Sequence, residues 1–338
     1  MVTTTLTPPV TDPTPTADAG PRPVPELAPA VLPSTGRMSQ PTGTDGRQPP
    51  VRLSGPPAPS PVVVTLAVIM TASVIAAFFG VFAFGLSGLQ QERSQRQLYA
   101  EFRGLLDPSS PTAPSIGGTI APGTPVALVD APQAGLHNEV VVEGTSSGTL
   151  LNGPGHLSDT PLPGQAGNAV LLGKSATAGA PFARITQLRR GDIISVRTGQ
   201  GNFQYSVLGQ VAAGARLPTI ARDSGLLTLV TTGGSGRLGR LASDRLIYVD
   251  AKLQSTPVGA PSGRTSTVTP QNLPGHNDPG AWPWVGLWLL VLLAGSVGIW
   301  WLWSRWGLLQ TWLVGAPVLF AVLWGLSDEA MRLLPNVY

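Results

Sequence analysis

The fold is decided by a stretch of short apolar runs between turn residues, Ala166–Val211, which reads AGNAVLLGKSATAGAPFARITQLRRGDIISVRTGQGNFQYSVLGQV. Three of its runs, 168–175, 192–199 and 203–211, are rich in Val, Ile, Leu and Tyr and are bounded by Gly, Asn and Asp, which is typical of β-strands. The turn RTGQGNF joins the last two runs and predicts a hairpin. Only APFARITQL, residues 180–188, suggests a short helix.

Further runs of the same kind lie on both sides of this stretch, at 125–132, 138–146, 226–234 and 245–254. Seven strands within about 130 residues, with turn residues between them and no alternating helices, predict a closed or sandwich-like all-β domain. The glycine-rich stretch TTGGSGRLGR, residues 231–240, lacks both the spacing of a phosphate-binding loop and a following helix. We therefore expect a mobile loop at that place.

Three segments without charged residues flank the β-region. Residues 62–86 are long enough as a helix to cross a hydrocarbon core of roughly 30 Å. Residues 284–303 and 306–326 are two more such segments, separated by Ser304-Arg305 and crowded with tryptophans near their ends. Because tryptophan prefers the membrane–water interface, we expect three transmembrane helices, the last two paired in a tight hairpin.

The N-terminal part differs in composition from the β-region. Residues 1–61 consist largely of Pro, Thr, Ala, Gly and Ser with almost no aromatic residue, so they predict a disordered tail. In the juxtamembrane segment 87–114, Leu98, Phe102 and Leu105 recur at helical spacing with charges between them. This segment predicts an amphipathic helix and a linker; the helix either packs on the β-domain or forms a stalk.

The remaining boundaries follow from composition. Residues 257–281 are rich in Pro, Ser, Thr and Gly and predict a second linker, and residues 327–338 form a short tail after the last span. The folded β-domain is therefore expected within residues 115–256.

The orientation in the membrane depends mainly on Arg305, which lies in the tip of the predicted hairpin. Since cytoplasmic loops carry an excess of positive charge, the tip and the N-terminal tail are expected inside the cell, and the β-domain outside it. Arg47 and Arg52 agree with this multi-pass topology, whereas Arg93 and Arg96 oppose it.

The composition excludes several classes of function. The chain of 338 residues has a net charge of +3 without any basic run, so nucleic-acid binding is not indicated. It contains no cysteine, which removes disulfides, thiolate metal sites and any cysteine nucleophile. His137, His156 and His276 are scattered, so neither a metal nor another cofactor is expected.

Several motifs of the β-region closely resemble the core of sortases, the membrane-anchored transpeptidases of Gram-positive bacteria, and in particular the class E type of actinobacteria. They are GPGH, PLPGQAGN, GAPFARITQLRRGD, LTLVTT and DRLIYVDAKL, which follow in this order within residues 120–255. The resemblance implies a sortase-like eight-stranded β-barrel, mainly β, flanked by the three membrane helices. It also implies an activity that cuts a secreted protein at a C-terminal sorting motif and transfers it to an amine.

The sortase mechanism uses a cysteine nucleophile, a histidine acid/base and an arginine that supports the oxyanion or orients the peptide. By resemblance, Lys174 stands at the histidine position, Thr232 at the cysteine position and Arg245 at the arginine position. The small and polar neighbours of Lys174 at a strand end predict a solvated cation. His156 in GPGH matches a family histidine outside the triad and is expected to form structural hydrogen bonds.

Three hypotheses of function follow. The first is a catalytically inactive sortase-like domain that binds a secreted-protein tail or a cell-surface partner in the substrate groove. Arg245 would bind a carboxylate or carbonyl of that ligand. The second is a hydrolase or transpeptidase in which Thr232 is the nucleophile and a desolvated Lys174 is its base. The third is a membrane scaffold whose function resides in the three transmembrane helices. The oligomeric state stays open.

Overall fold

The computed structural model of the chain describes residues 60–107, 119–212, 224–242, 245–259 and 269–338. The chain divides into two units, Met1–Ala58 and Pro59–Tyr338, and only the second contains described residues. The predicted disordered tail, apart from its last two residues, lies outside the described residues. So do residues 108–114 of the juxtamembrane linker and 260–268 of the second linker.

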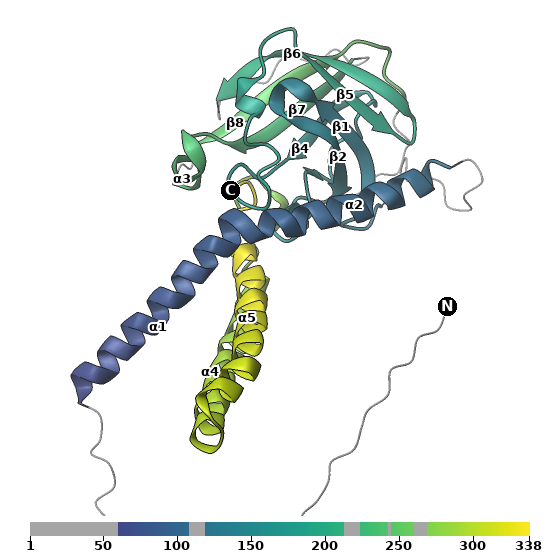
Figure 1. The fold of residues 1–338 in the computed structure, drawn as a ribbon. Coiled ribbons are helices and arrows are strands. Elements are labelled where there is room, and N and C mark those ends of the chain that lie inside the picture. The colour runs from purple at the N-terminus through teal and green to yellow at the C-terminus, as the bar shows by residue number, and fades with distance from the viewer. Residues whose placement is uncertain (1–59, 108–118, 213–223, 243–244, 260–268) are drawn as a thin grey trace, which may run out of the picture. The chain divides into compact units, whose positions relative to one another are not determined.

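Eight strands form a closed barrel, as the resemblance implied (Figure 1). They are β1 (Pro125–Ala131), β2 (Leu136–Glu143), β3 (Gly155–His156), β4 (Gly167–Leu172), β5 (Ile193–Thr198), β6 (Gly201–Ala212), β7 (Gly225–Thr232) and β8 (Leu246–Leu253). Their order around the barrel is β1-β2-β3-β4-β7-β8-β6-β5, and β5 pairs with β1 to close it. Seven of the strands coincide with the predicted runs, and the hairpin between β5 and β6 is confirmed.

Alternate residues of the strands fill the barrel with side chains. Leu171 of β4, Leu229 of β7 and Val249 of β8 are fully buried and belong to one hydrophobic cluster. This alternation follows from the two-residue period of a strand, which sends every second side chain to the same face. It explains why short runs of Val, Ile and Leu were sufficient to predict the strands.

The pairing of three strands determines where the candidate site lies. β4 and β7 run parallel with Leu172 beside Val230, so both strands end at the same end of the barrel. β7 and β8 are antiparallel with Thr232 opposite Leu246, so β8 begins at that same end.

Two local predictions are wrong. In residues 180–188 the structure has only a 3-10 turn, Ile185–Gln187, because the amide of Phe182 bonds back to the carbonyl of Lys174, at 3.0 Å, instead of starting a helix. In residues 231–240, where a mobile loop was expected, the short helix α3 (Gly236–Leu241) begins four residues after β7 ends. The backbone turns there at Gly234 and Gly236, which both have positive φ.

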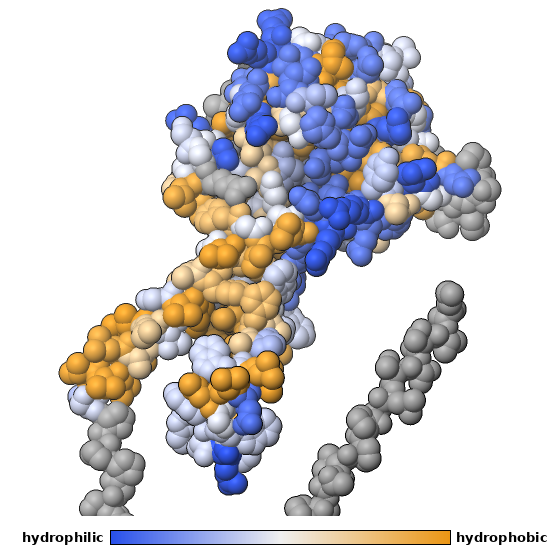
Figure 2. Space-filling model, in the orientation of Figure 1, coloured by the Kyte–Doolittle hydropathy of each residue, from blue (hydrophilic) through white to orange (hydrophobic). Residues whose placement is uncertain are grey.

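Within the described residues, three apolar helical segments are each long enough to cross a membrane. The first runs without a break through α1 (Pro61–Val81), the π-helical segment η1 (Phe82–Leu86) and α2 (Ser87–Leu105); the others are α4 (Trp282–Arg305) and α5 (Leu308–Arg332). Ser60 caps α1 by accepting a hydrogen bond from the amide of Val63, and Pro61 fits its first turn. Figure 2 shows hydrophobic residues gathered over α1 and over the part of α4 and α5 nearest the barrel, whereas the surface of the barrel is mostly hydrophilic.

Of the two alternatives for the juxtamembrane helix, packing on the β-domain and forming a stalk, the structure has the first, because α2 packs on the barrel. Phe102 is fully buried against Leu128 of β1 and Val140 of β2, and Leu98 packs on the same cluster. The apolar helical segments also contact each other: the ring of Phe82 meets that of Trp324 in α5 edge to face, with 5.1 Å between the ring centroids.

Candidate functional site

The candidate site lies where β4 and β7 end. Lys174 is two residues beyond β4, Thr232 is the last residue of β7, and Arg245 directly precedes β8. The parallel pairing of β4 and β7 therefore brings Lys174 and Thr232 to one end of the barrel. Arg245 joins them through its backbone, since its carbonyl accepts a hydrogen bond from the amide of Gly233 at 2.8 Å. Its side chain is exposed.

The prediction that Lys174 is solvated is wrong, because its side chain is fully buried. The loop after it folds back, and the buried ring of Phe182 lies so close that a Cβ on Gly173 would approach it to 2.4 Å. None of the described residues accepts a hydrogen bond from the Lys174 Nζ atom. Burial therefore lowers the pKa of the Lys174 ammonium group from its ordinary value of 10.5 to about 7.

The hydroxyl of Thr232 is paired with another hydroxyl instead of with the lysine. The Oγ atom of Ser175 lies 2.5 Å from the Oγ1 atom of Thr232, and both residues are buried. Ser175 was missed as a site residue by sequence reasoning, although a hydroxyl directly beside Lys174 was a usable signal. The site thus contains an uncharged hydroxyl pair and a desolvated amine without a hydrogen bond between them.

Residues beyond α5 complete the site. The segment Leu333–Tyr338 ends in a tight turn in which the amide of Tyr338 donates to the carbonyl of Pro335 at 3.2 Å. The carbonyl of Val337 accepts hydrogen bonds from the amide of Ser175 at 3.1 Å and from the hydroxyl of Thr232 at 3.4 Å.

The side chain of Val337 is fully buried among Leu150, Leu157, Leu172 and Val230. We call these four residues, together with Ser175, Thr177 and Thr232, the β4/β7 site. The site also includes the backbone of Thr145, Leu273 and Gly275, which binds the side chain of Asn336. Residues 327–338 are therefore not a free tail: α5 continues to Arg332, and the residues after it pack on the barrel. In the sequence, PNVY carried a turn signal, but nothing in it pointed to a distant docking place.

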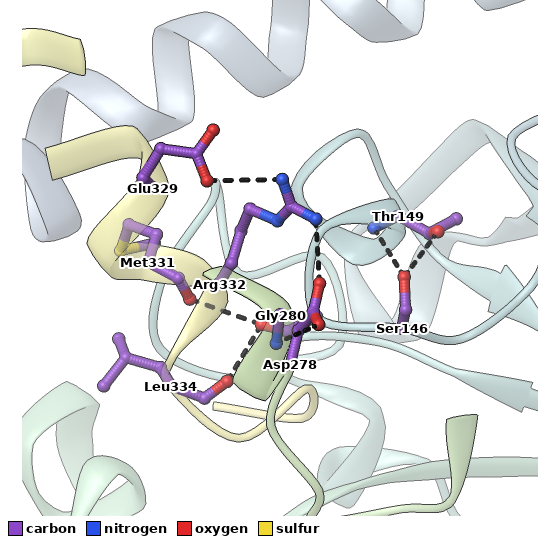
Figure 3. Close-up of polar contacts among 9 residues, drawn as sticks. Ser146, Thr149, Asp278, Gly280, Glu329, Met331, Arg332 and Leu334 are labelled. Carbon is purple, nitrogen blue, oxygen red and sulfur yellow. Dashed lines mark hydrogen bonds and ion pairs between the residues drawn. The ribbon is translucent and has the colours of Figure 1, made fainter. Parts of the chain in front are cut away.

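Polar contacts fix the end of α5 beside the barrel (Figure 3). Arg332 donates to Asp278 at 2.8 Å and to Glu329 at 3.2 Å. The hydroxyl of Ser147 donates to the carbonyls of Leu334 at 2.9 Å and Met331 at 3.3 Å. The described parts of the predicted linker 257–281 therefore take part in a packed structure around the site.

A polar cleft adjoins the β4/β7 site. Its volume is about 480 Å³, and Gly179, Pro181, Arg184 and Arg240 are among the residues that line it. Arg240 of α3 connects the two places, because its Nε atom donates to the carbonyl of Ser175 at 2.8 Å. The guanidinium group of Arg240 thus contacts the backbone of the residue that carries one of the two paired hydroxyls.

His156 forms structural hydrogen bonds, as expected. It is fully buried, its Nδ1 atom lies 2.8 Å from a carboxylate oxygen of Glu143, and its Nε2 atom lies 3.0 Å from the carbonyl of Pro161. These contacts tie β3 to β2 and to the following loop. No hydrogen bond between His156 and the candidate site residues Lys174, Thr232 or Arg245 is found within the described part of the chain.

Comparison with known proteins identifies the barrel. Residues 129–254 match the family model of the sortase domain. No curated protein matches the chain. Among solved structures, a sortase E of Streptomyces avermitilis is 30% identical, with 42% of this chain and 98% of that chain covered and a TM-score of 0.33.

Two further solved structures show the same kind of similarity. The sortase D5 transpeptidase of Clostridium perfringens is 24% identical, with 48% of this chain and 99% of that chain covered and a TM-score of 0.39. Sortase E1 of Streptomyces coelicolor, solved with a tripeptide in the active site, is 25% identical, with 41% and 93% covered and a TM-score of 0.34.

Proposed function

Because the chain carries a domain of the sortase family at residues 129–254, we propose that it is a membrane-held sortase-like protein that binds a peptide at the β4/β7 site without cutting it. Sortases act on the sorting signals of secreted cell-wall proteins, so the expected ligand is the tail of a secreted protein or of another cell-surface partner. The barrel stands outside the cell in this proposal, with the tip of the α4–α5 hairpin and the N-terminal residues inside.

One observation carries the peptide-binding part of the proposal: the β4/β7 site holds a peptide turn through its main chain. The amide of Ser175 and the hydroxyl of Thr232 both donate to the carbonyl of Val337, and the hydroxyl of Thr177 donates to that of Tyr338 at 2.7 Å. Main-chain hydrogen bonds of this kind give affinity for a peptide whatever its side chains are.

We propose binding without peptide cleavage because of the reactive side chains that the chain has and lacks. The chain has no cysteine, and a thiolate is what makes acyl transfer easy near neutral pH. A threonine hydroxyl needs an adjacent base instead, and Thr232 is hydrogen-bonded to Ser175 rather than to an amine. The β4/β7 site is thus suited to hold a carbonyl group and lacks a nucleophile of ordinary strength.

Peptide binding can be measured with the full chain in nanodiscs. A panel of fluorescent peptides copies the C-terminal tails of secreted proteins encoded nearby, and at least one is expected to bind. Arg245→Ala should weaken that binding about tenfold or more, because a hydrogen bond to a charged group contributes about 1.5–3 kcal/mol. Arg197→Ala removes an exposed arginine of β5 and is the matched control. If no tail binds either the full chain or a chain from which Leu333–Tyr338 has been removed, or if Arg245→Ala and Arg197→Ala bind the tails alike, the proposal is wrong.

A second candidate function is kept because burial gives Lys174 a pKa of about 7, which suits a general base. In this reaction, the Thr232 oxygen attacks a peptide carbonyl, its proton passes to the Lys174 amine, and the released amine of the substrate takes that proton as an ester forms on Thr232. The Lys174 Nζ atom would first have to come within hydrogen-bond reach of the hydroxyl.

Mass spectrometry distinguishes the two candidates. The second one requires an acyl adduct on Thr232 after incubation with a sorting-signal peptide, with loss of the adduct in Lys174→Met. Lys252→Met changes the only other lysine of the chain, which is exposed, and should keep the adduct. We expect no adduct on any of the three proteins, and a clear adduct on the wild type would refute the non-cutting proposal.

A further inference from the structure

The peptide held at the β4/β7 site belongs to the same chain. Its turn, Pro335–Tyr338, follows α5 within a few residues and presents two side chains inward, those of Asn336 and Val337, which are both fully buried. A segment that was fixed only by the end of a membrane helix would not need two buried side chains of such different chemistry. The contacts of Asn336 and Val337 therefore indicate which peptide side chains the site selects.

We propose that the β4/β7 site recognises a peptide turn in which asparagine is followed by an aliphatic residue, and that the segment Leu333–Tyr338 occupies this site in cis until such a turn from another protein displaces it. This inference rests on the proposed peptide-binding function and names the class of ligand and the competitor.

Recognition of the asparagine comes from three backbone groups. The Nδ2 atom of Asn336 donates to the carbonyls of Thr145 at 2.7 Å and Leu273 at 3.0 Å, and its Oδ1 atom accepts from the amide of Gly275 at 2.9 Å. An aspartate lacks the two donors, so two carbonyl oxygens would face a carboxylate in a buried place. Buried polar groups without a partner cost more than an ordinary hydrogen bond contributes, which makes this position selective.

Recognition of the next residue comes from shape and apolar surface. The Val337 side chain lies in the cluster of Leu150, Leu157, Leu172 and Val230 and has no contact with water. Full burial of a valine side chain contributes about 1.5–3 kcal/mol, whereas a charged side chain there would lose its hydration without gaining a partner. The site therefore favours a branched aliphatic residue after the asparagine.

At the third position of the turn, Tyr338, the hydrogen bond from the site is made to the backbone. The hydroxyl of Thr177 donates to the carbonyl of Tyr338, and the Tyr338 side chain is only partly buried beside the aliphatic cluster. A backbone contact of this kind places no strong demand on the side chain, so we expect selectivity at Asn336 and Val337 and tolerance at Tyr338.

Tethering makes the cis segment a strong competitor. A short tether gives an effective concentration on the order of mM, so a free peptide with micromolar intrinsic affinity must overcome a large excess of local ligand. The end of α5 limits the segment further, because Arg332 is paired with Asp278 and Ser147 binds the carbonyl of Leu334. Displacement thus couples the site to the end of a membrane helix.

The inference is tested with the full chain in nanodiscs and a fluorescent peptide that copies Leu333–Tyr338. Val337→Asp puts a carboxylate into the aliphatic cluster and should expel the cis turn, so the peptide is expected to bind this variant at least tenfold more tightly than the wild type. Val258→Asp makes the same change at a half-exposed valine and is the control. A peptide with the Asn336→Asp change should bind the Val337→Asp protein at least tenfold more weakly.

A second variant keeps the native side chains, in case Val337→Asp disturbs the barrel. It carries a specific protease site between Arg332 and Leu333, and cutting should raise peptide affinity as the released segment leaves. Hydrogen exchange of the Ser175 amide, which donates to Val337, reports whether the site is vacant.

The outcomes separate this inference from the proposed function. Equal peptide affinity before and after vacating the site, or equal binding of the Asn336→Asp peptide, overturns the inference. If secreted-protein tails bind a vacated site but the copied peptide does not, the proposed function stands and the inference fails. If the copied peptide binds and discriminates while no secreted tail binds, recognition of the turn stands and the proposed function fails.

Discussion

Lys174 illustrates how far a single residue can be interpreted from its neighbours. Small and polar residues around it predicted a hydrated side chain, yet it is fully buried. Its burial depends on the return of Phe182 over Gly173 and on the whole loop that follows. Such contacts are set by tertiary structure, so local composition could identify the position of Lys174 by resemblance but not its environment.

The burial of Lys174 predicts a specific pH dependence of stability. Its pKa is about 7 in the folded chain and near 10.5 in the unfolded one, so between these values the unfolded state binds an extra proton. The free energy of unfolding should therefore rise as the pH increases through this window, while below it both states are protonated and the penalty is constant. Lys174→Met removes this term and should be more stable than the wild type at neutral pH, by several kcal/mol.

Urea denaturation of the detergent-solubilised chain at pH 7, 8, 9 and 10 measures this effect. The difference between Lys174→Met and the wild type should shrink as the pH rises. Lys252→Met changes an exposed lysine of β8 and should follow the wild type at every pH. Parallel pH profiles for wild type and Lys174→Met would contradict the desolvation of this amine.

At the scale of elements, strands were predictable where they were long and apolar. β3 was not, because it has only two residues and exists through its pairing with β2 and β4. The predicted helix at 180–188 did not form because the amide of Phe182 bonds back to the carbonyl of Lys174, and the residues around it form only short turns, such as that from the amide of Ala183 to the carbonyl of Ala180. A strand of two residues is too short to show a hydrophobic period, so the sequence carried no signal for β3.

The start of α2 holds the loop that buries Lys174. The hydroxyl of Ser87, at the start of α2, donates to the carbonyl of Ala83 at 2.7 Å and accepts from the amide of Ala178 at 3.1 Å. Ala178 and Ala180 both have positive φ, which costs of order 1–3 kcal/mol for each such residue. The contact with α2 thus stabilises a strained loop next to the candidate site.

Gly88 provides a test of this contact. A Cβ at Gly88 would lie 3.5 Å from the backbone of Gly179, so alanine fits, whereas the larger side chain in Gly88→Leu should push the loop away. We expect this variant to expose Lys174 and to increase its labelling by an amine-reactive reagent several-fold, as measured by mass spectrometry.

Gly104→Leu is the matched control, because nothing lies within 4 Å of a Cβ at that position of α2. Labelling of Lys174 should stay at the wild-type level in this variant. If Gly88→Leu also leaves the labelling unchanged, α2 does not hold the loop.

At the scale of the whole molecule, the barrel and the three apolar helices could be predicted. The packing of the C-terminal segment Leu333–Tyr338 on the barrel could not. Strand patterns, charge-free segments and the family resemblance were each local properties of the sequence. The docking of Leu333–Tyr338 joins residues that are far apart in the chain, and it depends on the shape left open where β4 and β7 end. Periodicity and composition carry no information on such a complementarity.

The position of Val337 in the apolar cluster also has a consequence for biogenesis. All eight strands precede α4 and α5 in the chain, so a newly made barrel lacks one of its buried side chains until both of these helices have been synthesised. The apolar core at this end of the barrel is therefore complete only when the last residues of the chain have docked. A chain in which they do not dock presents an unfinished apolar surface, and exposed surface of this kind makes a protein prone to aggregation.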